Sequence, residues 1–183
     1  MLAFFLRDAL SQFRGLKRHA EKAMAQVSDE DFFATLDPNS NSVAVIVKHI
    51  AGNLRSRWSD FLTSDGEKPD RRRDSEFELE PSDTRAGLLE RWEAGWRTLF
   101  AAIEPLSPED LAREVSIRGE PHTVMKAINR QLTHYAEHIG QIVLLAKHLA
   151  GDGWQTLSIE RGKSEEFTRD KLARPEPGAE SPK

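Results

Sequence analysis

Apolar residues recur at helical spacing along four long segments of this chain, and this periodicity constrains the fold more than any other feature of the sequence. They return every three or four residues over about 2–25, 40–62, 82–103 and 123–150, whereas the period-two alternation of strands is almost absent. An amphipathic helix is stable in water only when its apolar stripe packs against other elements. The sequence therefore predicts an all-α domain.

Residues that favour helix starts and ends mark the limits of these segments. Ser28 can cap a short acidic turn that follows the first helix, and Ser82 and Asp83 can cap the third. Thr123 can cap the last helix, which is expected to end at Gly151. The helix boundaries predicted from the sequence therefore coincide with the ends of the apolar stripes.

Two connections between the helices differ in character. Residues 64–81 are charged and poor in apolar side chains, which is typical of a mobile surface loop in which only Phe77 and Leu79 dock. The alternative for this segment is a cover over a site. Residues 114–120 alternate briefly and contain a glycine, which indicates a small hairpin or loop before the last helix.

The length of 183 residues is that of one domain. We place this domain at residues 1–167, because apolar residues such as Trp154 and Phe167 are able to pack back on the helices after the last of them ends. Residues 168–183 are expected to form a disordered C-terminal tail, since the final stretch lacks core-forming side chains.

The composition argues against several classes of protein. The chain has no cysteine, which excludes disulfides, cysteine-ligated metals and a nucleophilic thiol of its own. No stretch approaches the roughly 20 apolar residues of a membrane span, and no cleavable signal pattern precedes Arg7 and Asp8, so we expect a cytoplasmic protein with no membrane contact. The net charge of −4 argues against a nucleic-acid partner.

Three of the six histidines lie on amphipathic helices. At about 100° per residue, His134 and His138 are separated by about 40° and one turn, so both imidazoles project from one side and can share an ion. His49 lies at the border of the apolar arc of its own helix, as His138 does. Metal and ligand sites of helical proteins are commonly found where the core meets a groove, and both helices direct their histidines there.

The residues alone leave two interpretations of these histidines open. They are boundary histidines bonded to a carbonyl or to water, or they hold one divalent ion and leave it open positions for a substrate, as a catalytic site requires. Asn53 and Gln141, on the histidine side of their helices, either orient a ligand or are polar residues that border a groove. Arg57 either binds a substrate carboxylate or covers the helices with its stem and reaches solvent.

The order of these elements, the histidine in VKHIAGN and the run HYAEHIGQIVLLAKHL in the last helix resemble the DinB-like superfamily of metalloenzymes, which includes the YfiT-like proteins. The likeness spans about residues 1–150, and the later segment LSIERGKSEEF resembles an uncharacterised subgroup. The resemblance implies an antiparallel four-helix bundle with a long crossover connection. It also implies a divalent metal ion, zinc or nickel, held by His49, His134 and His138.

The resemblance also implies a class of activity. Characterised members of the superfamily act with low-molecular-weight thiols, so a metal-dependent S-transferase that uses a small thiol, or a hydrolase that uses water, is expected to act on a small-molecule substrate. The alternatives are a bundle that binds a metal or small ligand without turnover, and a partner-binding bundle with no ion. A homodimer is implied too, and the four tryptophans favour one, because a small core is not expected to hide them all.

Overall fold

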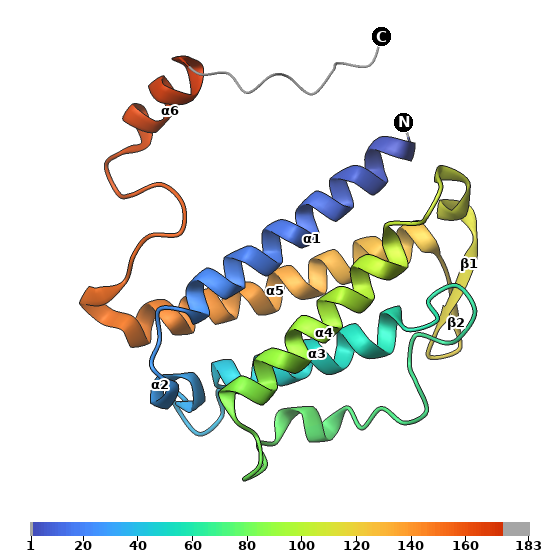
Figure 1. Ribbon diagram of the computed structural model, residues 1–183, viewed down its shortest axis with the longest axis horizontal. Coiled ribbons are helices and arrows are strands. Elements are labelled where there is room, and N and C mark those ends of the chain that lie inside the picture. The colour runs from blue at the N-terminus through green and yellow to red at the C-terminus, as the bar shows by residue number, and fades with distance from the viewer. Residues whose placement is uncertain (1, 174–183) are drawn as a thin grey trace.

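Four long helices lie side by side in the structure, a computed structural model that describes residues 2–173 (Figure 1). They are α1 (Leu2–Met24), α3 (Val43–Trp58), α4 (Arg85–Ile103) and α5 (Val124–Ala150). In Figure 1, α1 and α5 run in one direction, and α3 and α4 run in the other. Helix α3 packs against α4 and α5, and α1 packs against α5. The predominantly helical fold class predicted from the periodicity is confirmed.

The remaining elements are short. They are α2 (Asp29–Phe33), η1 (Asp74–Phe77), η2 (Pro108–Ala112), η3 (Gly151–Gly153), α6 (Ser164–Ala173) and the strands β1 (Glu114–Ile117) and β2 (Glu120–Thr123). The two strands form the expected hairpin, with Ile117 opposite Glu120. Arg118 and Gly119 connect them with φ values of 57° and 74°, the signature of a type I′ turn.

The observed helix ends differ from the predicted ones in two places. Thr123 caps α5 as expected, but Thr84 caps α4 instead of Ser82 or Asp83. The carboxylate of Asp83 is engaged elsewhere, because it pairs with Lys48 at 2.7 Å. Helix α3 ends at Trp58 and does not continue to residue 62.

An aromatic cluster forms the centre of the core. Phe13 of α1 contacts Trp58 of α3 with ring centroids 6.0 Å apart, and Trp96 of α4 contacts Tyr135 of α5 at 5.6 Å. Trp58, Trp92 and Trp96 are each at most 2% exposed. Three of the four tryptophans are therefore hidden in the core, and only Trp154 is partly exposed. The three buried rings are not available for a dimer face, and the homodimer stays a prediction.

Helices α3 and α4 approach each other closely at a glycine. A Cβ atom at Gly95 would lie 2.8 Å from the Cβ of Leu54, closer than two carbon atoms can come without a shift of the backbone.

Within residues 2–173, no helix is both long and apolar enough to cross a membrane.

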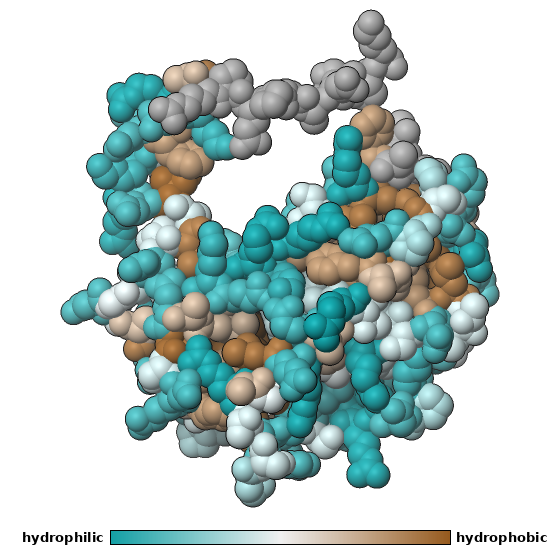
Figure 2. All heavy atoms as spheres, viewed as in Figure 1, coloured by the Kyte–Doolittle hydropathy of each residue, from teal (hydrophilic) through white to brown (hydrophobic). Residues whose placement is uncertain are grey.

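The chain beyond α5 is only partly attached to the helices. Trp154 and Leu157 pack against the core as expected, but Ile159 and Phe167 are exposed, which corrects the prediction that they dock. Helix α6 extends over residues 168–173, for which the sequence predicts disorder, and it has no buried residue. It stands away from the other helices in Figures 1 and 2. Residues 174–183 of the predicted tail lie outside the described residues.

Candidate metal centre

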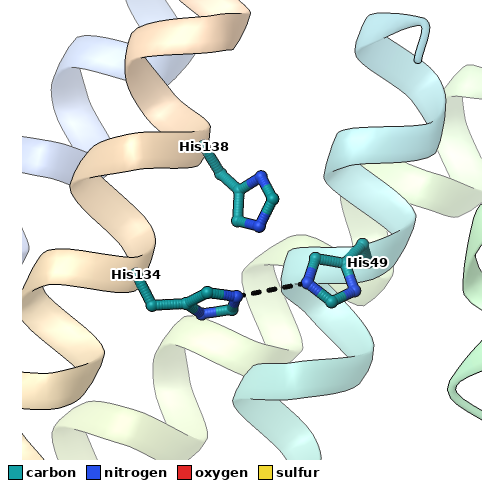
Figure 3. A group of neighbouring side chains, drawn as sticks. All are labelled: His49, His134 and His138. Carbon is teal, nitrogen blue, oxygen red and sulfur yellow. Dashed lines mark hydrogen bonds between the residues drawn. The ribbon is translucent and has the colours of Figure 1, made fainter. Parts of the chain in front are cut away.

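Three histidines from two helices face one another (Figure 3). Helix α3 contributes His49, and α5 contributes His134 and His138; one ring nitrogen of each lies within 4.8 Å of the others. The Nε2 atoms of His49 and His134 are 3.3 Å apart. Two nitrogens bound to one tetrahedral zinc ion at about 2.0–2.1 Å would lie about 3.3–3.4 Å apart, so this pair already has the spacing of two ligands. The convergence expected from the helix geometry is seen.

Hydrogen bonds orient two of the three rings for metal binding. The Nδ1 of His49 lies 2.9 Å from Oε2 of Glu76, and the Nδ1 of His138 lies 3.1 Å from Oε1 of Gln141. Both oxygens only accept, so each Nδ1 carries the proton and donates. Each Nε2 therefore keeps its lone pair for an ion. Gln141, predicted to orient a ligand, contacts His138.

The environment also keeps the imidazoles of His134 and His138 neutral. Burial lowers the pKa of His134 to about 3, and the neighbouring His138 and His49 add to this effect. Burial lowers the pKa of His138 as well. Neutral imidazole is the form that binds metal ions, so these two residues are in the binding form at neutral pH.

The carboxylate that orients His49 comes from η1, within the segment predicted to be a mobile surface loop. Glu76 is buried, and Arg71 holds both of its oxygens, with Nε to Oε1 and a terminal nitrogen to Oε2 at 2.8 Å each. Phe77 docks as expected, with its ring centroid 4.7 Å from that of His49, whereas Leu79 is exposed. The prediction that only Phe77 and Leu79 of this segment dock is therefore wrong, because Arg71 and Glu76 also pair with each other against α3. Other charged residues of the segment are exposed, as expected of a surface loop, among them Arg72, Asp74 and Glu80.

These pairs keep Glu76 ionised. Burial raises the pKa of the carboxyl group, but the hydrogen bonds from Arg71 and His49 outweigh burial and hold the pKa below its ordinary range. A carboxylate that accepts from the Nδ1–H of a ligating histidine is the usual outer partner in protein zinc sites. The set of side chains present therefore fits a divalent ion.

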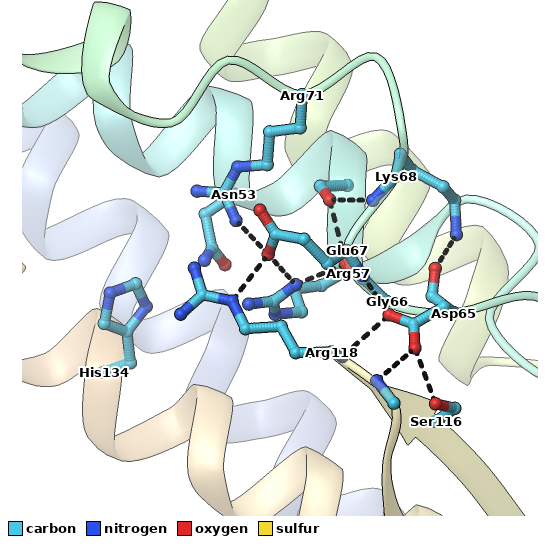
Figure 4. Close-up of polar contacts among 12 residues, drawn as sticks. Asn53, Arg57, Asp65, Gly66, Glu67, Lys68, Arg71, Ser116, Arg118 and His134 are labelled. Carbon is cyan, nitrogen blue, oxygen red and sulfur yellow. Dashed lines mark hydrogen bonds and ion pairs between the residues drawn. The ribbon is translucent and has the colours of Figure 1, made fainter.

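A second carboxylate links this segment to α3 and to the hairpin (Figure 4). Glu67 accepts hydrogen bonds from Arg57 at 2.8 Å, from Arg71 at 3.2 Å and from Arg118 at 3.3 Å. Arg57 also donates to the carbonyl of Gly66. Arg57 is only 5% exposed, so the alternative in which its guanidinium reaches solvent is wrong.

Asp65 anchors the start of the same segment to the hairpin. Its oxygens accept from the hydroxyl of Ser116 at 2.6 Å and from the backbone nitrogens of Glu67, Arg118 and Gly119 at 2.7–2.8 Å. Burial raises the pKa of this carboxyl group, but the four hydrogen bonds outweigh it and hold the pKa well below the ordinary range. The start of the segment that carries Glu76 is thus attached to the β1–β2 hairpin.

A glycine on α3 makes room for Glu76. A Cβ atom at Gly52 would lie 2.7 Å from Cδ of Glu76, so no larger residue fits beneath the carboxylate. Reasoning from the sequence missed Glu76 and Arg71. One signal in the sequence could have revealed a close neighbour at this place. Gly52 lies inside a helix, three residues after His49, where glycine is unfavourable unless another group needs the space.

Asn53 lies in a buried hydrogen-bond chain. Its Oδ1 accepts from the hydroxyl of Tyr135 at 3.0 Å, and that hydroxyl accepts from Nε1 of Trp58 at 3.1 Å. Asn53 follows His49 by one turn of α3, and Tyr135 follows His134 directly. The chain therefore joins the two helices next to the histidines, and a contact of Asn53 with a ligand stays a prediction.

Comparison with known proteins gives one match. The model of a family described as "Protein of unknown function (DUF1572)" matches residues 2–163, which include every residue of the histidine cluster and of the network around it. No curated protein and no solved structure matches the chain.

Proposed function

The chain belongs to the DUF1572 family of proteins of unknown function, and we propose that it is a metal-dependent enzyme whose divalent ion is held by His49, His134 and His138. The convergence of three imidazoles from two helices, with two ring nitrogens 3.3 Å apart, carries this proposal. An ion with three neutral imidazole ligands retains an open position and its positive charge, with which it lowers the pKa of water or a thiol.

The reaction that we propose is the transfer of a group to a small thiol, or hydrolysis by water. The chain has no cysteine, so the thiol has to come from outside it. The residues around the site orient the ligands: Glu76 holds the proton on Nδ1 of His49, and Gln141 holds the proton on Nδ1 of His138. Both contacts leave the Nε2 atoms directed toward a common centre.

We further propose that the chain is a member of the DinB-like superfamily. In this proposal α1, α3, α4 and α5 form the antiparallel four-helix bundle, and residues 59–84 are its long crossover connection. The parallel directions of α3 and α4 support it, because the chain has to return along α3 before α4 begins (Figure 1). Zinc or nickel as the ion, a homodimer and a cytoplasmic location belong to the same proposal and rest on the resemblance.

The first test of the metal centre is elemental analysis of protein purified without a metal-affinity column. We expect about one equivalent of a divalent transition metal per chain, as three imidazole ligands would hold. Protein that contains no metal and binds none of zinc, nickel, cobalt or copper on titration would contradict the proposal.

The second test compares two histidines on α5. His138→Ala removes a proposed ligand, whereas His148→Ala removes an exposed histidine further along the same helix. A bound ion stabilises the folded state, so added metal should raise the melting temperature of the wild type and of His148→Ala, but much less that of His138→Ala. The far-ultraviolet helical signal should survive in all three. Equal responses would show that His138 is not a ligand.

A further inference from the structure

The tip of the β1–β2 hairpin carries an arginine in a conformation that L residues rarely adopt. Arg118 has a φ of 57°, at a turn position where asparagine or glycine is usual. Asp65 holds it there, because its oxygens accept from the backbone nitrogens of Arg118 and Gly119 at 2.8 Å each. The backbone of this arginine is therefore held in place at the tip of the hairpin despite the strain.

The side chain of Arg118 extends from the hairpin toward His134 (Figure 4). Its Nε donates to Glu67 at 3.3 Å, and half of the side chain remains exposed. Within the described residues, no hydrogen bond reaches its two terminal nitrogens. A guanidinium group thus points toward the histidine cluster with two of its nitrogens available to a ligand.

The network around Arg118 has an excess of positive charge. In their side-chain ion pairs, three guanidinium groups, those of Arg57, Arg71 and Arg118, share two carboxylates, Glu67 and Glu76. A third carboxylate, Asp65, holds the backbone of Arg118, and Lys68 nearby offsets the charge of that carboxylate. Burial lowers the pKa of Arg57, and the charges of Arg71 and Arg118 lower it further. A divalent ion on three neutral imidazoles would add two more positive charges. The site as a whole therefore favours an anion.

Several buried side-chain atoms have no hydrogen-bond partner within the described residues. Among them are Nε of Arg57, both ring nitrogens of His122, and Nδ1 of His134. Burial is the main cause of the lowered pKa of His122 and of His134, and the positive charge of Arg57 lowers both further. Buried polar groups in folded proteins are almost always paired, so atoms such as these are met by water or by a polar ligand. These atoms come from α3, β2 and α5.

We propose that Arg118 and Arg57 form an anion-binding subsite beside the histidine cluster, so that the substrate carries a carboxylate or another oxyanion besides the group that binds the ion. Guanidinium groups suit this role, because their planar forks match the two oxygens of such an anion. Arg118 is then a specificity-determining residue. The proposal rests on the metal-dependent function proposed above.

The test uses cobalt-loaded protein and three thiols that share the same two-methylene spacer and differ in the charge of their end group. They are 3-mercaptopropionate, 2-mercaptoethanol and cysteamine, which are anionic, neutral and cationic. Binding of each is followed by the thiolate-to-cobalt absorption band. We expect the wild type to bind 3-mercaptopropionate about tenfold more tightly than 2-mercaptoethanol, and cysteamine least tightly, because one charge-assisted hydrogen bond is worth about this factor.

Arg118→Met should abolish this preference and leave the affinity for 2-mercaptoethanol within about twofold of the wild type. Arg118→Lys should retain part of the preference. Arg113→Met is the matched control, because Arg113 lies just before β1, is equally exposed and pairs with Asp110 instead of Glu67. Unchanged preference in Arg118→Met, or equal affinities of the wild type for all three thiols, would overturn the subsite alone. Failure of cobalt to bind would overturn the metal centre and the subsite with it.

Discussion

The orientation of His49 depends on a single carboxylate that lies 27 residues further along the chain. Glu76 accepts from its Nδ1, and Arg71 holds both oxygens of that carboxylate in turn. The imidazole is therefore held by a chain of charge-assisted hydrogen bonds and not by packing alone. Changes to this chain should alter metal binding without removing a ligand.

Glu76→Gln should weaken metal binding about 10- to 100-fold, the usual effect of losing an outer partner of a ligating histidine. The affinity can be measured by competition with a chromophoric chelator. Glu78→Gln is the matched control, because Glu78 lies two residues further on with an exposed side chain. If Glu76→Gln and Glu78→Gln bind the ion as tightly as the wild type, the carboxylate does not support the centre.

Two helical glycines should respond in opposite ways to alanine. At Gly52 a Cβ atom would displace Glu76, whereas at Gly140 it would meet nothing within 4 Å. Gly140→Ala should stabilise the protein by about 0.5–1 kcal/mol, because alanine favours the helix, and leave metal binding unchanged. Gly52→Ala should not gain this stability, because the new Cβ atom displaces Glu76, and it should weaken metal binding for the same reason. Urea unfolding and metal titration of both variants measure these effects, and a normal metal affinity in Gly52→Ala would count against the role of Glu76.

At the scale of elements, the segment between α3 and α4 determines how the site is covered. It is anchored by Asp65 at the hairpin and by Arg71 and Glu76 over α3. The hairpin in turn carries Arg118. The connection between two helices and a two-stranded sheet therefore act together as the outer wall of the histidine cluster.

Asp65→Asn should destabilise the protein by about 1–3 kcal/mol at neutral pH, because it removes a charged acceptor of four hydrogen bonds. The pKa of this group is lowered in the folded state, so its stabilisation is present above the unfolded value of about 3.9 and is lost as the pH falls through the lower folded value. The difference between wild type and variant should therefore be full at pH 7 and shrink below about pH 4.

Urea unfolding across this pH range measures the effect of Asp65→Asn. Asp74→Asn is the control, since Asp74 lies in the same segment with a fully exposed side chain. A difference that stays constant down to about pH 2 would show that the charge of Asp65 does not contribute to stability.

At the scale of the whole molecule, the packed part of the structure ends before α6. Trp154 and Leu157 pack on the core, and Gln155 exchanges hydrogen bonds with Gln26 at the end of α1. Helix α6 has no buried residue, and the family match ends at residue 163. The segment after α5 therefore divides into an attached part and an exposed part.

Removal of residues 164–183 should change the free energy of unfolding by less than about 0.5 kcal/mol, because no buried contact is lost within the described part of the segment. Removal of residues 151–183 should be clearly destabilising, since it also deletes Trp154 and Leu157. Thermal melting of the two truncated proteins distinguishes these cases. A large loss on the shorter truncation would mean that α6 contributes to the stable unit.

The sequence by itself determined the features that depend on local spacing. The period of the apolar residues predicted the four long helices, and the four-residue spacing of His134 and His138 placed both on one side of α5. The sequence likewise predicted the cap at Thr123 and a hairpin in residues 114–120. These features follow from the geometry of neighbouring residues, which is the same in every chain.

Only the tertiary structure decided what surrounds the histidines. The charged residues 64–81 read as a solvated loop, because a sequence does not show which charges will meet. In the fold, α3 and the segment before α4 bring together two arginines and two glutamates, which pair and become buried or half-buried: Arg57, Glu67, Arg71 and Glu76. Burial of a charge is favourable only when its partners are already in place, and such partners are brought together by the fold and not by sequence spacing.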